Sequence, residues 1–387
     1  MRRLPGFRMT DWRGRVAQMS RVGATPRRPG LPWARIFVGP GVLTVAFLAA
    51  CEPGDAPPSR PGAGEVGPVP GEALVGPETG APVAEGLPSE SSLRPAGTED
   101  WPGASDSIPG TAWTRQDWEI FRQVLRKADE LSLDTLPLGE ALGQMGALFL
   151  GTPYVPRTLE VPGPERLVVN FRGLDCVTFV ENVLALTRFQ RVHGTGLLDK
   201  PDIARSRYDA DLMSLRYRDG RIEGYSSRLH YFSEWLSRGE EAGRLYLASS
   251  DLGGIQDHEQ LGFMTSHAEA YDQLRDPETV RAIRGVEESL SASGPRVFIP
   301  QERLAEAAPG IRTGDIIAAT STLEGLDVAH TGIAYWTDGQ LHLLHAPLVG
   351  STVVLSERTL AERIRRIESQ DGIMVARPLD DWFRGGG

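Results

Sequence analysis

The sequence predicts an α+β fold, in which a helix packs on an antiparallel sheet, for residues 111–387 of the 387-residue chain. Two observations lead to this prediction. In the stretch "RQDWEIFRQVLRKADEL" apolar residues such as Trp118, Phe121 and Val124 recur at helical spacing, whereas towards the C-terminus short apolar runs alternate with turn residues. Helices followed by strands along one chain are typical of α+β domains.

Three helices are predicted ahead of residue 200. The first spans residues 115–131, and the second follows Thr135, a plausible N-cap, and ends near Gly151. The third is "CVTFVENVLALTRFQ", which begins at Cys176. The other elements predicted before the C-terminal part are a short strand at residues 166–171 and helical stretches at residues 209–215 and 269–290.

The C-terminal part contains short apolar runs bounded by turn residues, and these predict β-strands. The runs are residues 314–320, 330–336, 340–346, 351–356 and 372–378. Asp338 and Gly339 separate the second run from the third, and this dipeptide favours the tight turn of a β-hairpin.

Residues 1–50 are predicted to be a secretory signal. They contain nine Arg and one Asp, and the apolar run from Ile36 to Ala50 is shorter than the ~20 residues that a spanning helix needs. The ending Leu-Ala-Ala-Cys resembles the lipobox of bacterial lipoproteins, in which the cysteine, here Cys51, becomes the lipidated first residue. The alternative is an ordinary signal that happens to end near a cysteine. Met1, Met9 and Met19 all stay open as starts.

A lipidated Cys51 predicts an exported protein that is anchored to a membrane of the cell envelope. In a diderm host the protein would face the periplasm, with the outer membrane as one option. Residues 51–110 are predicted to be the flexible tether, because 12 Pro and 11 Gly fall among residues 52–110. The chain carries a net charge of −10 although residues 1–50 are basic, so nucleic acid is not an expected partner.

Cys176 lies at the predicted start of a helix, directly after Asp175. Helix N-termini carry unsatisfied N–H groups and a partial positive charge, which lower the pKa of a thiol and can stabilise an oxyanion. Asp175 is expected to cap the helix rather than to act as a catalytic acid. If Cys51 is lipidated, Cys176 is the one remaining thiol of an exported protein, which makes it a candidate nucleophile.

A thiol nucleophile needs a general base, which is usually histidine. Of the seven histidines, His330 lies near the start of the first strand of the predicted hairpin and His345 near the end of the second. Antiparallel pairing brings these two positions to the same end of the hairpin, where one imidazole can act as base while the other orients it. His342, three residues before His345, should face the opposite side of the strand.

Simpler interpretations of these residues stay open. A single His on a strand and a small Cys in an apolar helix are often core residues. One Cys and two His could also bind Zn²⁺. No CxxC, HxH or HExxH pattern accompanies them, however, so the sequence predicts neither a metal site nor a cofactor.

Six blocks occur in an order that resembles a known family: "LGTPYV", "LDCVTFVENVLAL", "SRLHYFSEWL", "VFIPQERL", "GDIIAATSTLEGLDVAHTGIAYW" and "LLHAP". Over roughly residues 115–380 they resemble the DUF1460 family, an N-acetylmuramoyl-L-alanine amidase-like branch of the NlpC/P60 cysteine peptidase superfamily. The resemblance implies a papain-like fold with helical insertions. It implies Cys176 as nucleophile, His330 as general base and His345 as the residue that orients the base. Tyr154 would lie beside the thiol and help to hold the substrate or the oxyanion.

The activity that the resemblance implies is hydrolysis of the amide between N-acetylmuramic acid and L-alanine in peptidoglycan fragments, through an acyl-enzyme. Arg228 and His230 could bind a carboxylate or sugar of this substrate, although Arg228 could equally be the ion-pair partner of an Asp or Glu. Two alternatives stay open. One is an endopeptidase that cuts the γ-D-glutamyl–diamino acid bond, and the other is a non-catalytic lipoprotein that binds muropeptides.

Overall fold

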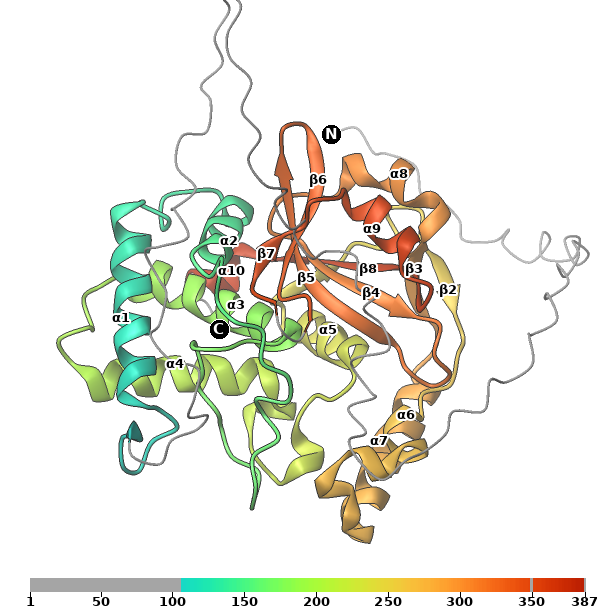
Figure 1. Ribbon diagram of the computed structural model, residues 1–387, viewed down its shortest axis with the longest axis horizontal. Helices are drawn as coiled ribbons and strands as arrows, with labels where there is room; N and C mark the ends of the chain where they lie inside the picture. The colour runs from blue at the N-terminus through green and yellow to red at the C-terminus, as the bar shows by residue number, and fades with distance from the viewer. Residues whose placement is uncertain (1–105, 349–350, 386–387) are drawn as a thin grey trace, which may run out of the picture. The chain divides into compact units, whose positions relative to one another are not determined.

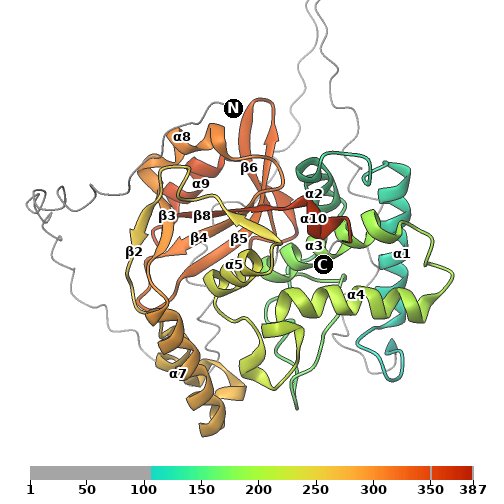
Figure 2. The same ribbon diagram turned by 180° about the vertical axis from the view of Figure 1, so that it is seen from behind.

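The structure, a computed structural model, describes residues 106–348 and 351–385 of the chain. Helices α1–α4 lie beside the sheet, as Figures 1 and 2 show from opposite sides. The predicted signal, Cys51 and most of the predicted tether lie outside the described residues. Residues 106–110, at the end of that tether, contact the folded part, because Asp106 accepts a hydrogen bond from the Gln116 N–H (3.0 Å).

The α-helices fall into two groups along the chain, those before residue 220 and those after it. Those of the first group are α1 (Arg115–Glu130), α2 (Leu138–Ala147), α3 (Cys176–His193) and α4 (Pro201–Arg216). Those that follow are α5 (Phe232–Glu241), α6 (Phe263–Ser266), α7 (Pro277–Ala292), α8 (Leu304–Ala307), α9 (Leu360–Arg366) and α10 (Asp380–Phe383). Among the described residues no helix is both long enough and apolar enough to cross a membrane.

The strands form one eight-stranded sheet within the described residues, and every pairing in it is antiparallel. The strands are β1 (Leu245–Leu247), β2 (Ile255–Asp257), β3 (Arg296–Pro300), β4 (Ile316–Ser321), β5 (Val328–Thr337), β6 (Gln340–His345), β7 (Val354–Leu355) and β8 (Gln370–Pro378). Their order is β2-β3-β8-β4-β5-β6-β7, and β1 pairs with β8. The prediction of helices packed on an antiparallel sheet is confirmed.

The hairpin of β5 and β6 also forms as predicted. Asp338 and Gly339 connect the two strands, and both have positive φ angles, 49° and 72°. Positive φ at both central residues defines the type I′ turn, whose twist matches that of the flanking strands. The start of β5 and the end of β6 therefore lie at the same end of the hairpin.

The second predicted helix is shorter than expected, and Thr135 does not cap it. The Thr135 hydroxyl donates to the Ser132 carbonyl (2.8 Å), which closes a turn ahead of the helix. Pro137 occupies the N-cap position instead, and its carbonyl accepts the Ala141 N–H (3.0 Å). The helical stretch expected at 269–290 likewise begins later, at Pro277, because Asp276 caps α7 with its side chain.

The strand predicted at residues 166–171 is wrong. The segment has no regular secondary structure and no partner strand, and side chains satisfy part of its backbone. The Val168 carbonyl accepts from Arg216 Nη1 (2.7 Å), and the Phe171 N–H donates to Asp117 Oδ1 (3.0 Å). Alternating apolar residues indicate a strand only where another strand is available for pairing.

Helix α3 contacts α1, α2 and α4 as well as β5 of the sheet, and it is buried on nearly all sides. Phe179 and Val183 of α3 share one hydrophobic core with Ile333 of β5 and Leu344 of β6. Gly146 of α2 allows this close packing, since a Cβ there would lie 2.8 Å from Leu344 Cδ2. The start of α3 is thereby fixed relative to the hairpin.

Candidate active site at the start of α3 and the end of the β5–β6 hairpin

Cys176 is the first residue of α3, and it is buried, with 2% of its surface exposed. Asp175 is the N-cap, as predicted: its Oδ1 accepts the Thr178 N–H (2.8 Å), and the Thr178 hydroxyl accepts the Asp175 N–H (2.9 Å). This reciprocal capping box satisfies two backbone donors and leaves the thiol at the positive end of an 18-residue helix.

A strip of backbone joins this helix start to the chain that follows β6. The Leu174 N–H donates to the Pro153 carbonyl (3.0 Å), and the Val155 N–H donates to the Leu174 carbonyl (3.1 Å). On its other side the same segment pairs with residues 351–353, where the Tyr154 N–H donates to the Ser351 carbonyl (2.8 Å). Tyr154 is therefore positioned between the segment that leads into Cys176 and the segment that follows His345.

The two predicted histidines are in direct contact. His330 is near the start of β5 and His345 is the last residue of β6, and their Nε2 and Nδ1 atoms lie 2.7 Å apart. The rings meet edge to face, at 84°. Only 4% of His330 and none of His345 is exposed. Burial is the main cause that lowers the pKa of both imidazoles well below 6.5, so both are neutral at pH 7.

Arg363 of α9 is a neighbour of this pair that the sequence analysis did not identify. It is buried, and its positive charge further lowers the pKa of His330 and of His345. A signal was present in the sequence, since Leu360, Arg363 and Ile364 follow the i, i+3, i+4 spacing of a buried helix face. A basic residue within such an apolar stripe indicates a buried charge.

Side-chain alternation places the histidine pair relative to α3. Leu344 and Ile333 face the core that contains Phe179 of α3, so the neighbouring His345 faces the side of α9. A Cβ on Gly332 would lie 2.9 Å from the Cβ of His345, which confirms that the two positions share that side. The pair thus lies at the end of the hairpin strands, on the far side of the sheet from the body of α3.

His342 does not join this pair. Its Nδ1 lies 2.8 Å from the Ser356 carbonyl, and it is the cross-strand partner of Tyr335, which packs towards α2. Within the described part of the chain, no three His, Cys, Asp or Glu side chains form a group that could hold a metal ion.

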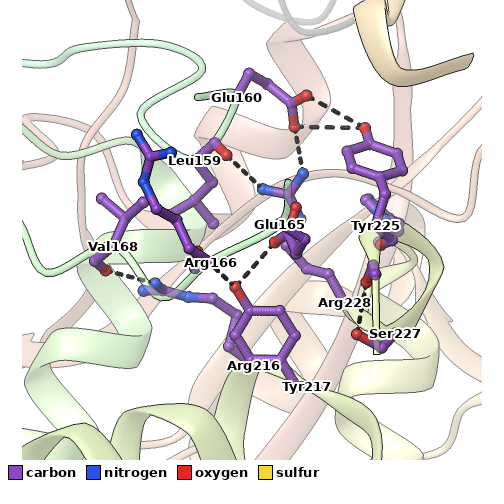
Figure 3. A network of polar contacts seen from close by, with 12 residues as sticks. Leu159, Glu160, Glu165, Arg166, Val168, Arg216, Tyr217, Tyr225, Ser227 and Arg228 are labelled. Carbon is purple, nitrogen blue, oxygen red and sulfur yellow. Dashed lines mark hydrogen bonds and ion pairs between the residues drawn. The ribbon is translucent and has the colours of Figure 1, made fainter. Parts of the chain in front are cut away.

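Arg228 is held by carboxylates of the protein itself, in the network drawn in Figure 3. Its Nη2 lies 2.6 Å from Glu160 Oε1 and its Nε lies 3.5 Å from Glu165 Oε1, while Nη1 donates to the Leu159 carbonyl (3.0 Å). Only 4% of Arg228 is exposed. These contacts agree with the interpretation in which Arg228 is the ion-pair partner of a carboxylate of the protein.

His230 lies close to Arg228 and also contacts the protein. Its Nε2 lies 2.8 Å from the Tyr225 carbonyl, and its ring centroid is 4.4 Å from that of Tyr225. Burial, followed by the charge of Arg228, lowers the pKa of His230 well below 6.5. These contacts hold Arg228 and His230 within the protein, so a role for either residue in binding substrate stays a prediction.

Comparison with known proteins agrees with this architecture. Residues 144–373 match the model of the AmiA-like family, described as N-acetylmuramoyl-L-alanine amidase-like. A crystal structure of an N-acetylmuramoyl-L-alanine amidase from Bacteroides uniformis is 37% identical, with a TM-score of 0.57, and the match covers 62% of this chain and 98% of that one. The search of curated proteins found no significant match.

Two further solved structures are similar. A Bacteroides fragilis protein named as a proposed xylanase is 35% identical, with a TM-score of 0.54 over 60% of this chain and 98% of that one. A Legionella pneumophila protein assigned to DUF1460 is 17% identical, with a TM-score of 0.50 over 68% and 95% of the two chains, and supports the fold alone. Because the family model matches more than half of its residues, the chain belongs to the N-acetylmuramoyl-L-alanine amidase-like family.

Proposed function

We propose that this protein is a cysteine amidase that hydrolyses the amide between the lactyl group of N-acetylmuramic acid and L-alanine in peptidoglycan fragments. Family membership supports an amidase-like hydrolase, and the amidase from Bacteroides uniformis suggests the bond. The observation that carries the cysteine mechanism is the buried contact of 2.7 Å between His330 and His345, in a chain whose α3 begins on a cysteine. A papain-like NlpC/P60 arrangement is part of the same proposal.

In this proposal the contact within the histidine pair leaves one nitrogen of His330, Nδ1, for catalysis. Nε2 of His330 contacts His345, so only Nδ1 can accept a proton from the thiol. In the neutral form His330 then carries its proton on Nε2 and donates it to Nδ1 of His345. His345 keeps its own proton on Nε2, and in this way it orients the base as the third member of a triad does.

The reaction divides into acylation and deacylation. Sγ of Cys176 attacks the amide carbonyl carbon while His330 takes the thiol proton, and the N–H groups at the start of α3, together with Tyr154, stabilise the oxyanion. The C–N bond then breaks as His330 passes that proton to the L-alanine amine. A water, deprotonated by His330, hydrolyses the thioester and releases the muramic acid carboxylate.

The position of the histidine pair sets a geometric requirement for this mechanism. Because His345 faces α9 while α3 packs on the other side of the sheet, the proposal requires Cys176 and His330 to meet at the end of β5. His330 is the third residue of β5, and the register between β4 and β5 shifts beside it. Such an irregularity redirects a side chain relative to regular alternation.

One digest tests both the bond and the nucleophile. Incubation with a defined muropeptide, followed by mass spectrometry, should release the intact stem peptide and leave a sugar without peptide. Cys176→Ala and His330→Ala should each abolish this release. Release of a peptide that lacks L-Ala-D-Glu would instead establish an endopeptidase. Release that persists in Cys176→Ala would refute the nucleophile, and no release by the wild type would favour a binding protein.

The location of the protein is a separate proposal. We infer from the Leu-Ala-Ala-Cys sequence that the protein is exported and anchored to a membrane through a lipid on Cys51. Cys51→Ser should move the protein from the membrane fraction to the soluble fraction. Continued membrane association of that variant would refute the anchor without affecting the amidase proposal.

A further inference from the structure

The loop that connects Tyr154 to Cys176 is held in place by a buried network of charges and hydroxyl groups. Figure 3 shows Arg216, Tyr217 and Arg228 pointing into this loop from the end of α4 and from the segment that follows it in the chain. Tyr217 donates to Glu165 Oε1 (2.8 Å), and Arg228 pairs with Glu160. The backbones of Tyr217 and Arg228 pair in an isolated antiparallel β-bridge, which holds these two residues side by side. The network thus fixes the path of the chain into α3.

Arg216 is the member of this network that reaches α3 itself. Its Nε lies 2.8 Å from Glu181 Oε2, and its Nη1 donates to the Val168 carbonyl (2.7 Å). The side chains of Arg216 and Glu181 are 2% and 1% exposed. One buried guanidinium therefore ties the loop before Cys176 to the second turn of the helix that Cys176 begins.

The charges around the start of α3 oppose one another. Asp175 precedes the thiol, and Glu181 lies five residues after it, about 7–8 Å along the helix axis. Both carboxylates disfavour a thiolate, while Arg216 favours one. Burial raises the pKa of Asp175 and Glu181, and the charges of Arg216 and Arg228 lower both. The field of Arg216 therefore extends to the residue next to Cys176.

We propose that Arg216 is a positioning residue for the Cys176 nucleophile, which fixes the loop that enters α3 and supplies the positive charge that offsets Asp175 and Glu181 beside the thiol. This inference rests on the proposed function, in which Cys176 passes its proton to His330 and is the nucleophile. Arg216 does not touch the substrate. It acts through the helix start, by placing the sulfur and by raising the thiolate fraction.

Two single variants separate this role from simple stabilisation. Arg216→Gln and Glu181→Gln break the same buried ion pair, so both should lower stability, and Arg216→Gln also loses the hydrogen bond to the Val168 carbonyl. Their electrostatic effects are opposite, because one removes a positive charge and the other removes a negative charge. We expect the midpoint of the thiol titration to rise by about one pH unit in Arg216→Gln and to fall by a similar amount in Glu181→Gln, as for a charge about 10 Å away.

The measurement is the rate of iodoacetamide labelling against pH, with the full-length protein and mass spectrometry of the peptide that contains Cys176. Following that peptide separates Cys176 from Cys51. Arg216→Lys keeps the charge but not the planar fork, so its midpoint should stay near that of the wild type even if the loop loosens. It also keeps the proposal testable if Arg216→Gln does not fold.

The control is the ion pair of Arg377 with Asp315, which is also largely buried and is joined by two contacts (2.9 and 2.7 Å). It lies at the start of β4, at the opposite end of that strand from the partner of His330. Arg377→Gln should leave the labelling midpoint of Cys176 unchanged. A shift equal to that of Arg216→Gln would indicate a general loosening and would overturn the proposal.

Midpoints that move in the same direction in Arg216→Gln and Glu181→Gln, or that do not move, would also overturn the positioning role. These outcomes differ from failure of the proposed function. That failure would appear as absent amidase activity in the wild type, or as activity that survives Cys176→Ala, whatever the labelling midpoints are.

Discussion

Replacement of His345 by Asn should change the pH dependence of folding by an amount that follows from burial. His345 is completely buried, and its pKa lies well below 6.5 in the folded protein. In the unfolded chain an imidazole has a pKa of about 6.5. Below that pH the unfolded state binds a proton that the folded state does not bind. The free energy of unfolding therefore falls as the pH falls, and this contribution is complete only above pH 6.5.

The size of the effect follows from the same linkage. For a folded state that stays unprotonated, the unfolded state gains about 0.1 kcal/mol at pH 7.5 and about 1.4 kcal/mol at pH 5.5 from protonation of one histidine. The variant His345→Asn lacks this titrating group. The stability difference between wild type and variant should therefore shift in favour of the variant by about 1.3 kcal/mol between these two pH values.

Urea unfolding followed by tryptophan fluorescence at pH 5.5, 6.5 and 7.5 measures this difference. Other titrating groups, including the buried carboxyls whose pKa is raised, act in both proteins and largely cancel. His258→Asn, at an exposed position, controls for the removal of an imidazole. A difference between wild type and His345→Asn that is the same at all three pH values would refute the claim that His345 is held neutral.

Three further predictions concern stability. Burial raises the pKa of Asp209 from 3.8 to about 6, against the hydrogen bond from Trp113 (2.7 Å), so the protein loses stability as the pH rises from about 4 to above 6. Asp209→Asn should stabilise the protein by about 3 kcal/mol at pH 7 and by about 0.5 kcal/mol at pH 4, as thermal unfolding at both pH values would show. Asp175→Ala should lower the free energy of unfolding by about 1 kcal/mol in chemical denaturation, because the capping box is lost. Asp175→Asn should keep most of this stability, because Asn also caps helices well. Gly146→Val should cost about 1–3 kcal/mol by the same assay, because the new side chain would overlap that of Leu344, and equal stability would show that this packing is loose.

The parts of the candidate site that the sequence predicted are those set by local pattern. The dipeptide of Asp338 and Gly339 indicated a hairpin, and strand pairing then required His330 and His345 to lie at one end of it. The position of Asp175 before an apolar helix indicated the cap. Each of these conclusions depends on a few neighbouring residues and on the geometry of one regular element.

The parts that could not be predicted depend on contacts between distant segments. Arg216 and Glu181 form a buried pair across 35 positions, and neither residue is unusual for an amphipathic helix. The residues at 166–171 have the composition of a strand, yet they pass beside α4 rather than beside another strand. Periodicity shows which residues are buried, but it does not show which segment provides the partner.

Residues 151–155 lie between the start of α3 and residues 351–353. This arrangement bears on the order in which parts of the chain fold. Cys176 and His330 are about 150 positions apart, so a chain that has been synthesised only as far as α4 contains the thiol helix but neither imidazole. Contacts of such long sequence separation form late, because a large loop must close before they stabilise the chain. In the proposed mechanism, a growing or partly folded chain contains the cysteine without its general base, and hydrolytic capacity appears only when the last third of the sequence has docked.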